Sequence, residues 1–445
     1  MSRSRTMNHP GNPMFSYRSR LRFPSHPRSL GARIPGALFF AFLGFMVLPA
    51  SAADWTQWRG PDHDGVSRET GLLSSWPEGG PGLLWKTEDM GVGYSNISFA
   101  GNRIYSMGDN GDSCFLYAID AKNGKGVWGL KVGQAGGNYK GPRCTPATDG
   151  KLVFALGQFG DFVCADAKNG KLLWKGNVEK ELGGRVMSGW NFSMSPVIDG
   201  NQVVLPIGGD GGTVIALERS EKGPKILWRS KEITDAAAYT SLVPITLGGV
   251  RQYLLLTEHR LAGIAAKDGK LLWQIDCPGR TAVCSDPAFW MENDNTCYVF
   301  ASCAYNVGAR GFKLSADGGR FNVEEIYSDQ KLQSHHGGIV QLGGNFYLLT
   351  QRELVCVDPK TGKTRWNNRS VGKGSIFSID GKLIVRGEAG DGTVALVDVN
   401  PDAYVEHGRF DQPERTSANS WTYPIVFNGR LYLRDQHLLL CYEVK

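Results

Sequence analysis

A unit of about the same length recurs eight times from Ala100 onwards, and this period constrains the fold more than any other feature. Each copy has a turn, an apolar strand, a second strand that ends in an acidic or small residue, and often an NGK-type turn followed by Trp. The clearest copies are CADAKNGKLLW (164–174) and CVDPKTGKTRW (356–366). The residues that end the second strand recur at intervals of 40 to 52 residues: Asp120, Asp166, Glu218, Ala265, Ser315, Asp358, Asp398 and Glu443. Such a period is typical of folds with four short strands per repeat.

The two ends of the repeat array predict how it closes. The last copy, residues 421–444, has three strands and stops where the fourth, Trp-bearing strand is due. The segment PGLLWK (81–86) reads as such a strand with no repeat before it. We therefore predict an all-β fold over residues 80–445, an eight-bladed β-propeller of four-stranded antiparallel blades. Its last blade is closed by the N-terminal strand, so that no sheet stays open at the seam.

The first 52 residues have the features of an export signal. They hold seven arginines and no acidic residue, then the apolar stretch ALFFAFLGFMVLPA (37–50), then small residues that suit cleavage before Ala53. We predict a signal peptide over residues 1–52 and export to the periplasm, the extracellular space or the cell surface. The apolar stretch is short for a membrane span, so we expect no stable span after cleavage, although an uncleaved anchor stays an open alternative.

The net charge of +6 is misleading, because it comes from this N-terminal region. Seven of the 49 basic side chains and none of the 43 acidic ones lie there, so the remainder carries a net charge of about −1. This balance excludes a nucleic-acid footprint. Between the signal and the ring, residues 53–79 are rich in Gly, Pro and Asp, which predicts an ordered loop. Its tryptophans, Trp55, Trp58 and Trp76, indicate that the loop packs across the propeller.

One disulfide can be predicted from strand register. The segments CSDPAFWM and TCYVFASC read as the first two strands of blade 5, and a four-residue loop between them would place Met291 opposite Thr296. In that register Cys284 faces Cys303 at bridging distance. Cys277 competes for Cys284 through the preceding loop. The chain has nine cysteines, an odd number that cannot all pair.

The tryptophans of the repeat carry a resemblance to a known family. Trp128, Trp174, Trp273 and Trp366 each fall eight residues after the acidic or small residue, behind NGK, NGK, DGK and TGK turns. This spacing resembles the tryptophan-docking repeat of the pyrroloquinoline-quinone (PQQ) family of propellers. The resemblance implies that these side chains are structural wedges between blades, and the full set comprises Trp85, Trp128, Trp174, Trp228, Trp273 and Trp366. Blades 5 and 7 lack such a Trp, so we expect weaker seams after them.

Members of this family differ in function, and the resemblance implies two readings. The first is a ligand-binding or protein-binding scaffold in the cell envelope, as in the lipoprotein of the outer-membrane β-barrel assembly machinery. The second is a PQQ-dependent alcohol dehydrogenase, including the polyvinyl-alcohol dehydrogenases, for which PQQ with calcium is the possible cofactor. The residues define neither a catalytic group nor a metal-ligand set, so whether the protein is an enzyme stays open at this point.

Topology predicts where a ligand would bind. In a four-stranded meander the innermost strand is the first, so the residues just before each first strand converge on the axis at one mouth of the channel. These residues are Tyr94, Arg143, Trp190, Asn191, Tyr239, Asp286, His335, His336, Lys373 and Trp421. Aromatic rings and cations suit a planar ligand with carboxylates, so we predict a small anionic ligand or an envelope protein as partner. The alternative is that these side chains only fill the channel. The adjacent histidines, if they lie in a strand, point to opposite faces and share no metal ion.

Overall fold

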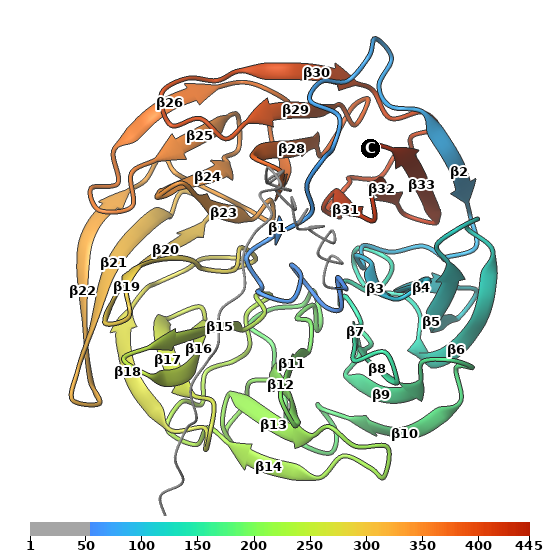
Figure 1. Ribbon diagram of the computed structural model, residues 1–445. Helices are drawn as coiled ribbons and strands as arrows, with labels where there is room; N and C mark the ends of the chain where they lie inside the picture. The colour runs from blue at the N-terminus through green and yellow to red at the C-terminus, as the bar shows by residue number, and fades with distance from the viewer. Residues whose placement is uncertain (1–53) are drawn as a thin grey trace, which may run out of the picture. The chain divides into compact units, whose positions relative to one another are not determined.

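The computed structural model describes residues 54–445, which form eight sheets arranged in a ring around a central axis (Figure 1). Every regular element in this part of the chain is a β-strand, and none of it is a helix with the length and hydropathy of a membrane span. The predicted eight-bladed propeller is thus confirmed. The predicted signal peptide lies outside the described residues.

Seven blades are meanders of four consecutive strands. Blade 1 contains β3 (Ser98–Ala100), β4 (Arg103–Asn110), β5 (Ser113–Asp120) and β6 (Gly126–Gln134). Blade 2 contains β7 (Ala147–Thr148), β8 (Leu152–Leu156), β9 (Asp161–Asp166) and β10 (Leu172–Asn177). Blade 3 contains β11 (Val197–Asp199), β12 (Gln202–Pro206), β13 (Val214–Glu218) and β14 (Ile226–Arg229). Blade 4 contains β15 (Val243–Leu247), β16 (Val250–Leu256), β17 (Arg260–Ala265) and β18 (Leu271–Asp276).

The second half of the ring repeats this order. Blade 5 contains β19 (Ala288–Asn293), β20 (Thr296–Cys303), β21 (Gly308–Asp317) and β22 (Arg320–Asp329). Blade 6 contains β23 (Ile339–Leu342), β24 (Asn345–Leu349), β25 (Leu354–Val357) and β26 (Thr364–Asn368). Blade 7 contains β27 (Gly374–Ile379), β28 (Lys382–Gly387), β29 (Val394–Asp398) and β30 (Glu406–Phe410). Blade 8 contains β31 (Ile425–Phe427), β32 (Arg430–Asp435), β33 (Leu438–Glu443) and β2 (Leu83–Thr87).

The ring closes through the two ends of the chain, as predicted. Strand β2 pairs antiparallel with β33, with Leu83 opposite Tyr442 and Thr87 opposite Leu439. In Figure 1 the blue β2 lies beside the dark red β33, so the start and the end of the chain share one sheet. This pairing covers the edge of β33, which would otherwise present unpaired backbone groups.

The tryptophans of the outer strands contact the next blade. The indole Nε1 of Trp128 donates to the carbonyl oxygen of Ala167 at 3.3 Å, and that of Trp174 donates to Ser220 at 2.8 Å. A Cβ atom at Gly170 would lie 2.5 Å from the Trp128 ring, so the turn of the following blade needs a glycine there. That glycine has a φ of 72°, a second reason why other residues are disfavoured.

Blades 5 and 7 replace the missing Trp with another aromatic ring. Tyr327 on β22 lies over Gly362 of blade 6, where a Cβ atom would meet the ring at 2.3 Å. Phe410 on β30 lies over Gly80, just before β2. A Cβ atom at Gly80 would lie 2.4 Å from the Phe410 ring. The expectation of weaker seams rested on the absence of Trp alone. Since the docking position is filled in both blades, that reason no longer applies.

Tyr327 offers a test of this docking role. We expect Tyr327→Ala to lower the free energy of unfolding by about 2 kcal/mol, because truncating a half-buried aromatic ring leaves a cavity at the seam. Tyr327→Phe should change it by less than about 0.5 kcal/mol, since the buried hydroxyl has no hydrogen-bond partner within residues 54–445. Urea denaturation of the two variants measures both values. An equal loss in both would show that the hydroxyl, and not the ring, stabilises the seam.

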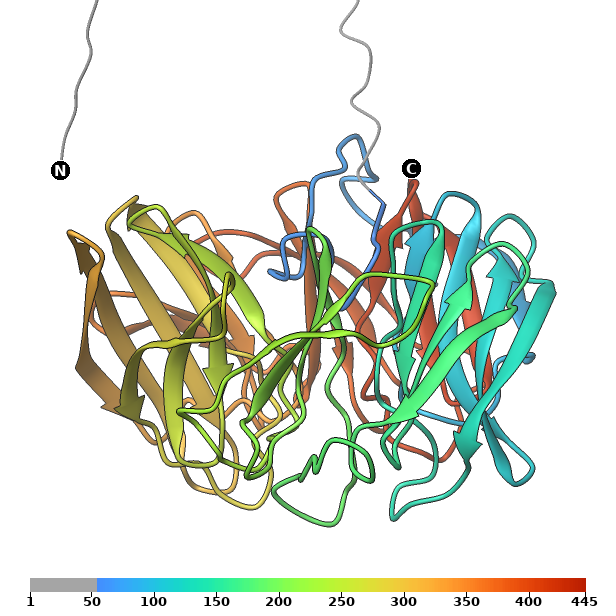
Figure 2. The ribbon, with the colours of Figure 1, turned by 90° about the horizontal axis from the view of Figure 1, so that it is seen from below.

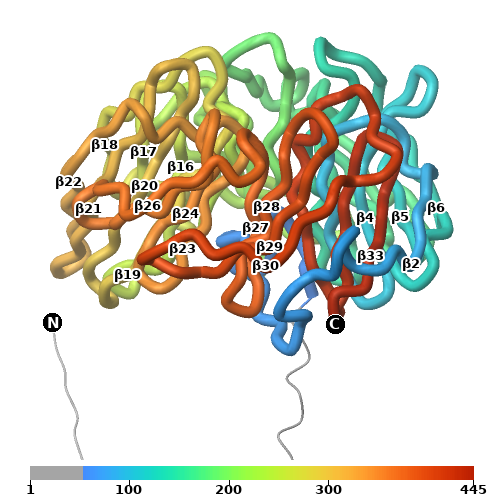
Figure 3. The backbone as a smooth tube through the Cα atoms, turned by 90° about the horizontal axis from the view of Figure 1, so that it is seen from above, coloured from blue at the N-terminus to red at the C-terminus, as the bar shows by residue number. Residues whose placement is uncertain are grey.

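The loop before β2 lies across one end of the channel and closes it. Its backbone and side chains bind successive blades: Trp55 O accepts from Phe99 N of blade 1 at 2.7 Å, and Thr56 O accepts from Thr148 N of blade 2 at 2.9 Å. Further along, β1 (Val66–Ser67) pairs parallel with β27 as a fifth strand on blade 7. The two side views place this loop and the C-terminal end at the same face (Figure 2 and Figure 3). The loop contacts the ends of first strands, such as Thr148 of β7 and Ile379 of β27, so it lies opposite the residues that precede these strands.

The predicted Cys284–Cys303 disulfide does not form in the structure, where both thiols are free. Met291 faces Cys297 and not Thr296, because β19 extends to Asn293 with a bulge and the turn is shorter than four residues. The register is thus shifted by one residue, and Cys284 lies before the first residue of β19. In the structure all nine cysteines are free thiols.

Candidate functional site

The axial mouth opposite the N-terminal loop holds a pocket with a cavity volume of about 150 Å³. Residues from every blade of the ring except blade 7 line it, together with one residue of the N-terminal loop. The lining consists of Trp58, Tyr94, Tyr139, Arg143, Trp190, Ser193, Ser195, Tyr239, Ser241, Ala282, Cys284, Asp286, Tyr305, His335, His336, Trp421 and Tyr423. Ten of these 17 side chains are aromatic when the two histidines are counted.

Eight of the ten residues that the topology predicts at the axial mouth line this pocket. Tyr94, Arg143, Trp190, Tyr239, Asp286, His335, His336 and Trp421 all line the pocket. Asn191 instead lines a separate cavity beside blades 2 and 3, because its φ of 64° turns the chain between it and Trp190. Lys373 is also outside the lining, and its Nζ forms an ion pair of 2.8 Å with Glu388.

The floor of the pocket comes from the N-terminal loop. The indole Nε1 of Trp58 donates to Asp286 Oδ2 at 2.5 Å, and the ring meets Tyr423 edge to face at a centroid distance of 4.8 Å. The other carboxylate oxygen, Oδ1, accepts from the backbone N–H of Ser241 at 2.7 Å. Burial raises the pKa of Asp286, while Arg59 nearby favours the charged form. Both oxygens of this carboxylate are therefore already engaged by the protein.

Arg143 is the cation of the pocket. Its Nη1 donates to the carbonyl oxygen of Trp190 at 3.1 Å and its Nη2 to that of Tyr139 at 3.0 Å. Its guanidinium carbon lies 5.8 Å from the ring centre of Tyr94. No ion pair involving Arg143 occurs within residues 54–445. Burial lowers its pKa, which reflects the loss of hydration of an uncompensated charge.

The two adjacent histidines both face the pocket, contrary to the expectation for a strand, because the chain bends at this point and β23 begins three residues later. Their Nδ1 atoms lie 3.4 Å apart, and His335 Nε2 contacts the Tyr305 hydroxyl at 2.9 Å. Burial holds the pKa of His335 at about 4. Burial and the neighbouring His335 hold the pKa of His336 well below its ordinary value, so both imidazoles are neutral at pH 7.

Tyr305 was missed from the sequence although it contacts His335. It lies in the hairpin between β20 and β21, and its φ of 60° is unusual for an aromatic residue. Such strained backbone occurs often at functional sites. A Tyr in a hairpin gives no sequence signal for this conformation.

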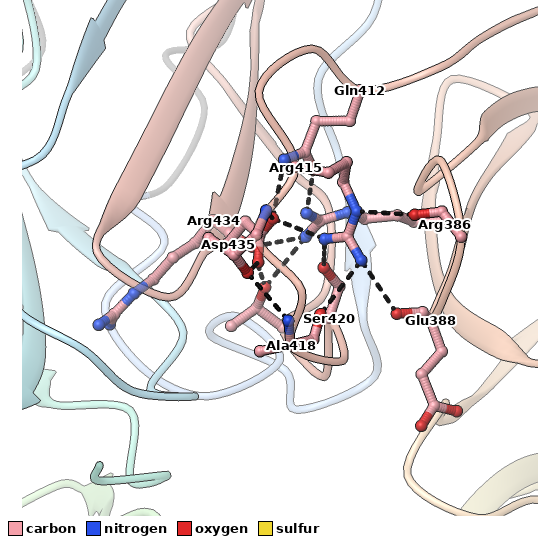
Figure 4. A network of polar contacts seen from close by, with 11 residues as sticks. Arg386, Glu388, Gln412, Arg415, Ala418, Ser420, Arg434 and Asp435 are labelled. Carbon is pink, nitrogen blue, oxygen red and sulfur yellow. Dashed lines mark hydrogen bonds and ion pairs between the residues drawn. The ribbon is translucent and has the colours of Figure 1, made fainter. Parts of the chain in front are cut away.

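A polar network lies behind the pocket, where Arg415 contacts Asp435, Ser420 and the backbone of Glu388 (Figure 4). The Trp421 indole donates to Glu388 Oε1 at 3.0 Å, and Lys373 pairs with the same carboxylate. Arg415 binds Asp435 at 2.7 Å and the Glu388 carbonyl oxygen at 3.3 Å, which ties the loop before β31 to blades 7 and 8. Trp421 in turn stacks on Tyr94, with ring centroids 4.2 Å apart. The aromatic wall is thus held by buried charges and is pre-organised.

Comparison with known proteins identifies the family. A family model described as outer membrane protein assembly factor BamB matches residues 112–368, more than half of the chain. The chain belongs to this BamB-like family of PQQ-type propellers. No curated protein sequence matches the chain.

Solved structures of BamB-like and other propellers resemble it in fold. Quinohemoprotein alcohol dehydrogenase from Comamonas testosteroni matches with a TM-score of 0.61 and 11% identity, over 87% of this chain and 80% of that one. BamB from Moraxella catarrhalis matches with a TM-score of 0.50 and 15% identity, over 76% and 95%. Saccharomyces cerevisiae Sqt1 matches with a TM-score of 0.56 and 10% identity, over 82% and 99%. At these identities the likeness concerns the fold alone.

Proposed function

We propose that this BamB-like propeller is an exported binding protein that takes a small planar, anionic ligand in the axial pocket. The observation that carries the proposal is Arg143, a cation without an ion pair among the described residues that lies in an aromatic-lined pocket. A partly dehydrated, unpaired charge costs free energy, and an anionic ligand offsets that cost through charge-assisted hydrogen bonds. The compartment follows from the signal peptide predicted for residues 1–52.

PQQ with calcium is the cofactor of the fold family's dehydrogenases, and the pocket residues fit it poorly. Calcium takes six to eight oxygen ligands, mostly carboxylates and carbonyls. Among the described residues that line the pocket, Asp286 is the one carboxylate and no amide side chain is present. Both Asp286 oxygens already accept protein hydrogen bonds. We therefore favour a binding role over that of a quinone-dependent dehydrogenase.

A screen of anionic aromatic compounds tests the proposal. We expect compounds that raise the melting temperature of the mature protein, and we expect Arg143→Ala and Trp190→Ala each to weaken their binding by about 1 to 3 kcal/mol, measured by calorimetry. Arg320→Ala is the matched control. Arg320 is exposed at the start of β22, on the face of the propeller opposite the pocket.

The same variants distinguish a binding site from a filled channel. A binding role predicts that both pocket variants melt close to the wild-type temperature, since the pocket side chains serve the ligand. If no compound binds and both variants lose stability equally, the side chains fill the channel and the proposal is wrong.

A further inference from the structure

We infer that Tyr139 occupies the axial pocket in place of the ligand, and that the ligand shares its chemistry: an aromatic amino acid with a free α-carboxylate, alone or at the end of a peptide. This inference rests on the proposed function and specifies its ligand class. Tyr139 belongs to the loop between β6 and β7, and the tip of this loop comprises residues 137–140. The contacts of Tyr139, the exposure of the loop tip and the charge of Arg143 support the inference.

Two side chains of the pocket hold Tyr139. Its carbonyl oxygen accepts a hydrogen bond from Arg143 Nη2 at 3.0 Å, and its ring centre lies 5.0 Å from that of Trp421. Arg143 precedes the first strand of blade 2, whereas Trp421 precedes the first strand of blade 8. The two contacts therefore show at which spacing the pocket holds an acceptor oxygen and an aromatic ring.

A free aromatic amino acid has the same spacing. In Tyr139 the carbonyl carbon and the ring-bearing Cβ are bonded to one Cα, and the carboxylate carbon and Cβ of an aromatic amino acid are bonded to its Cα in the same way. Such a ligand places a carboxylate oxygen at Arg143 and its ring on Trp421, where Tyr139 now lies. The two residues before Tyr139 are exposed, so solvent lies on the side where a peptide would continue.

The loop tip is held to the pocket by few contacts. Residues 137–140 are exposed, and Tyr139 itself is 45% exposed although it lines the pocket. The tip also donates an exposed hydrogen bond from Asn138 Nδ2 to the carbonyl oxygen of Gly189 at 3.3 Å. Segments with exposed hydrogen bonds and little buried surface open locally at low cost in free energy. A ligand can thus displace the tip.

Buried groups fix the loop on both sides of the tip. The backbone N–H of Gly136 donates to Asp109 Oδ2 at 2.9 Å, and the carbonyl oxygen of Pro142 accepts from the backbone N–H of Tyr94 at 2.8 Å. Asp109 is buried and Pro142 is buried as well. Displacement of the tip therefore leaves the ends of the loop, and the blades that they join, in place.

The charge of Arg143 favours the ligand over the loop. The carbonyl oxygen of Tyr139 is a neutral acceptor, whereas a carboxylate oxygen at the same position makes a charge-assisted hydrogen bond, which is roughly twice as strong. A guanidinium has five N–H donors, so the second carboxylate oxygen also finds a donor. Exchange of Tyr139 for an aromatic carboxylate therefore compensates a charge that the loop leaves uncompensated.

Calorimetric titration of the mature protein with four probes tests the ligand class. The probes are N-acetyl-L-phenylalanine, its carboxamide, N-acetyl-L-alanine and the tripeptide alanyl-alanyl-phenylalanine. We expect N-acetyl-L-phenylalanine to bind, and the carboxamide and the alanine derivative to bind more than about tenfold weaker through loss of the charge-assisted pair and of the ring. Tighter binding of the tripeptide would assign the site to peptide ends, and weaker binding to free acylated amino acids; both retain the shared chemistry.

Variants of Tyr139 test whether this residue takes the place of the ligand. Tyr139→Ala keeps the backbone carbonyl but removes the ring from Trp421, so N-acetyl-L-phenylalanine should bind roughly three- to tenfold tighter than in the wild type. Tyr139→Phe keeps the ring and should bind it as the wild type does. Arg143→Gln should abolish the preference for the acid over its carboxamide. Arg320→Ala should change none of these values.

The outcomes separate this inference from the proposed function. Weaker or unchanged binding to Tyr139→Ala would show that Tyr139 is part of the wall that contacts the ligand, and the inference fails. If other anionic aromatic compounds bind the wild type while N-acetyl-L-phenylalanine and the tripeptide do not, the inference fails and the binding role stands. If no anionic aromatic compound binds, the proposed function fails with it.

Discussion

In a protein that begins at residue 53, where cleavage is predicted, deletion of residues 53–87 will abolish cooperative unfolding of the propeller. Strand β2 is the outermost strand of blade 8, and its Trp85 ring lies over Gly124 of blade 1, where a Cβ atom would meet it at 2.5 Å. The deletion removes both the cover of β33 and the docking ring of the 8–1 seam. An exposed strand edge promotes pairing between molecules, so we expect aggregation or a broad, non-cooperative transition. Calorimetry measures the breadth of the unfolding transition, and size-exclusion chromatography measures aggregation.

Moving the strand to the other end of the chain provides the matched control. Leu83 lies opposite Tyr442, so residues 81–87 appended after Lys445 through a short turn would form an ordinary hairpin with β33. We expect this permuted chain to regain a cooperative transition. A truncated protein that melts like the full mature chain would contradict closure through the termini.

The variant Arg434→Met should lower the free energy of unfolding by about 2 to 4 kcal/mol. This arginine on β32 is 1% exposed and crosses from blade 8 to blade 1. Its guanidinium donates to the carbonyl oxygens of Ser95 at 2.7 Å, Gln436 at 2.9 Å and Gly91 at 3.2 Å. The loss of this one side chain leaves several buried acceptors unpaired, at about 1 kcal/mol or more each.

Arg430→Met is the matched control for this variant. Arg430 lies on the same strand and also reaches blade 1, but it makes one hydrogen bond there, to the carbonyl oxygen of Ala121 at 2.9 Å, and it is partly exposed. We expect a loss below about 1 kcal/mol. Urea denaturation measures both variants. A loss below about 1 kcal/mol for Arg434→Met, no larger than that for Arg430→Met, would show that the buried arginine does not stabilise the seam.

The ring and the composition of its mouth could be predicted because both follow from a regular repeat. Glycine turns and acidic strand ends recur with the blades, so they fix blade number and strand order, and strand order then places Arg143 and Trp190 at the axis. The N-terminal loop was predicted to pack across the ring. That Trp58 would form the floor of the pocket was not predictable, since its partner Asp286 lies 228 residues away.

The failures have local causes. The disulfide prediction depended on a single register, and one bulge near Glu292 shifts that register. Asn191 and Tyr305 adopt positive φ values that their residue types do not predict. The orientation of the side chains near them could therefore not be derived from the sequence. The docking position in blades 5 and 7 was overlooked because Tyr327 and Phe410 do not share the Trp signature.

Alkylation of Cys284 tests most directly whether the axial pocket is the binding site. All nine cysteines lie in the described part of the chain; Cys284 is half-buried where the other eight are buried, and it lines the pocket. Burial raises the pKa of its thiol to about 12, so the reaction with N-ethylmaleimide is slow and easily timed by peptide mass mapping. We predict that an anionic aromatic compound that calorimetry shows to bind slows labelling of Cys284 several-fold in the wild type, and that the same concentration of it does not do so in Arg143→Ala. Equal labelling rates with and without a ligand that calorimetry shows to be bound would place the ligand elsewhere and contradict the account.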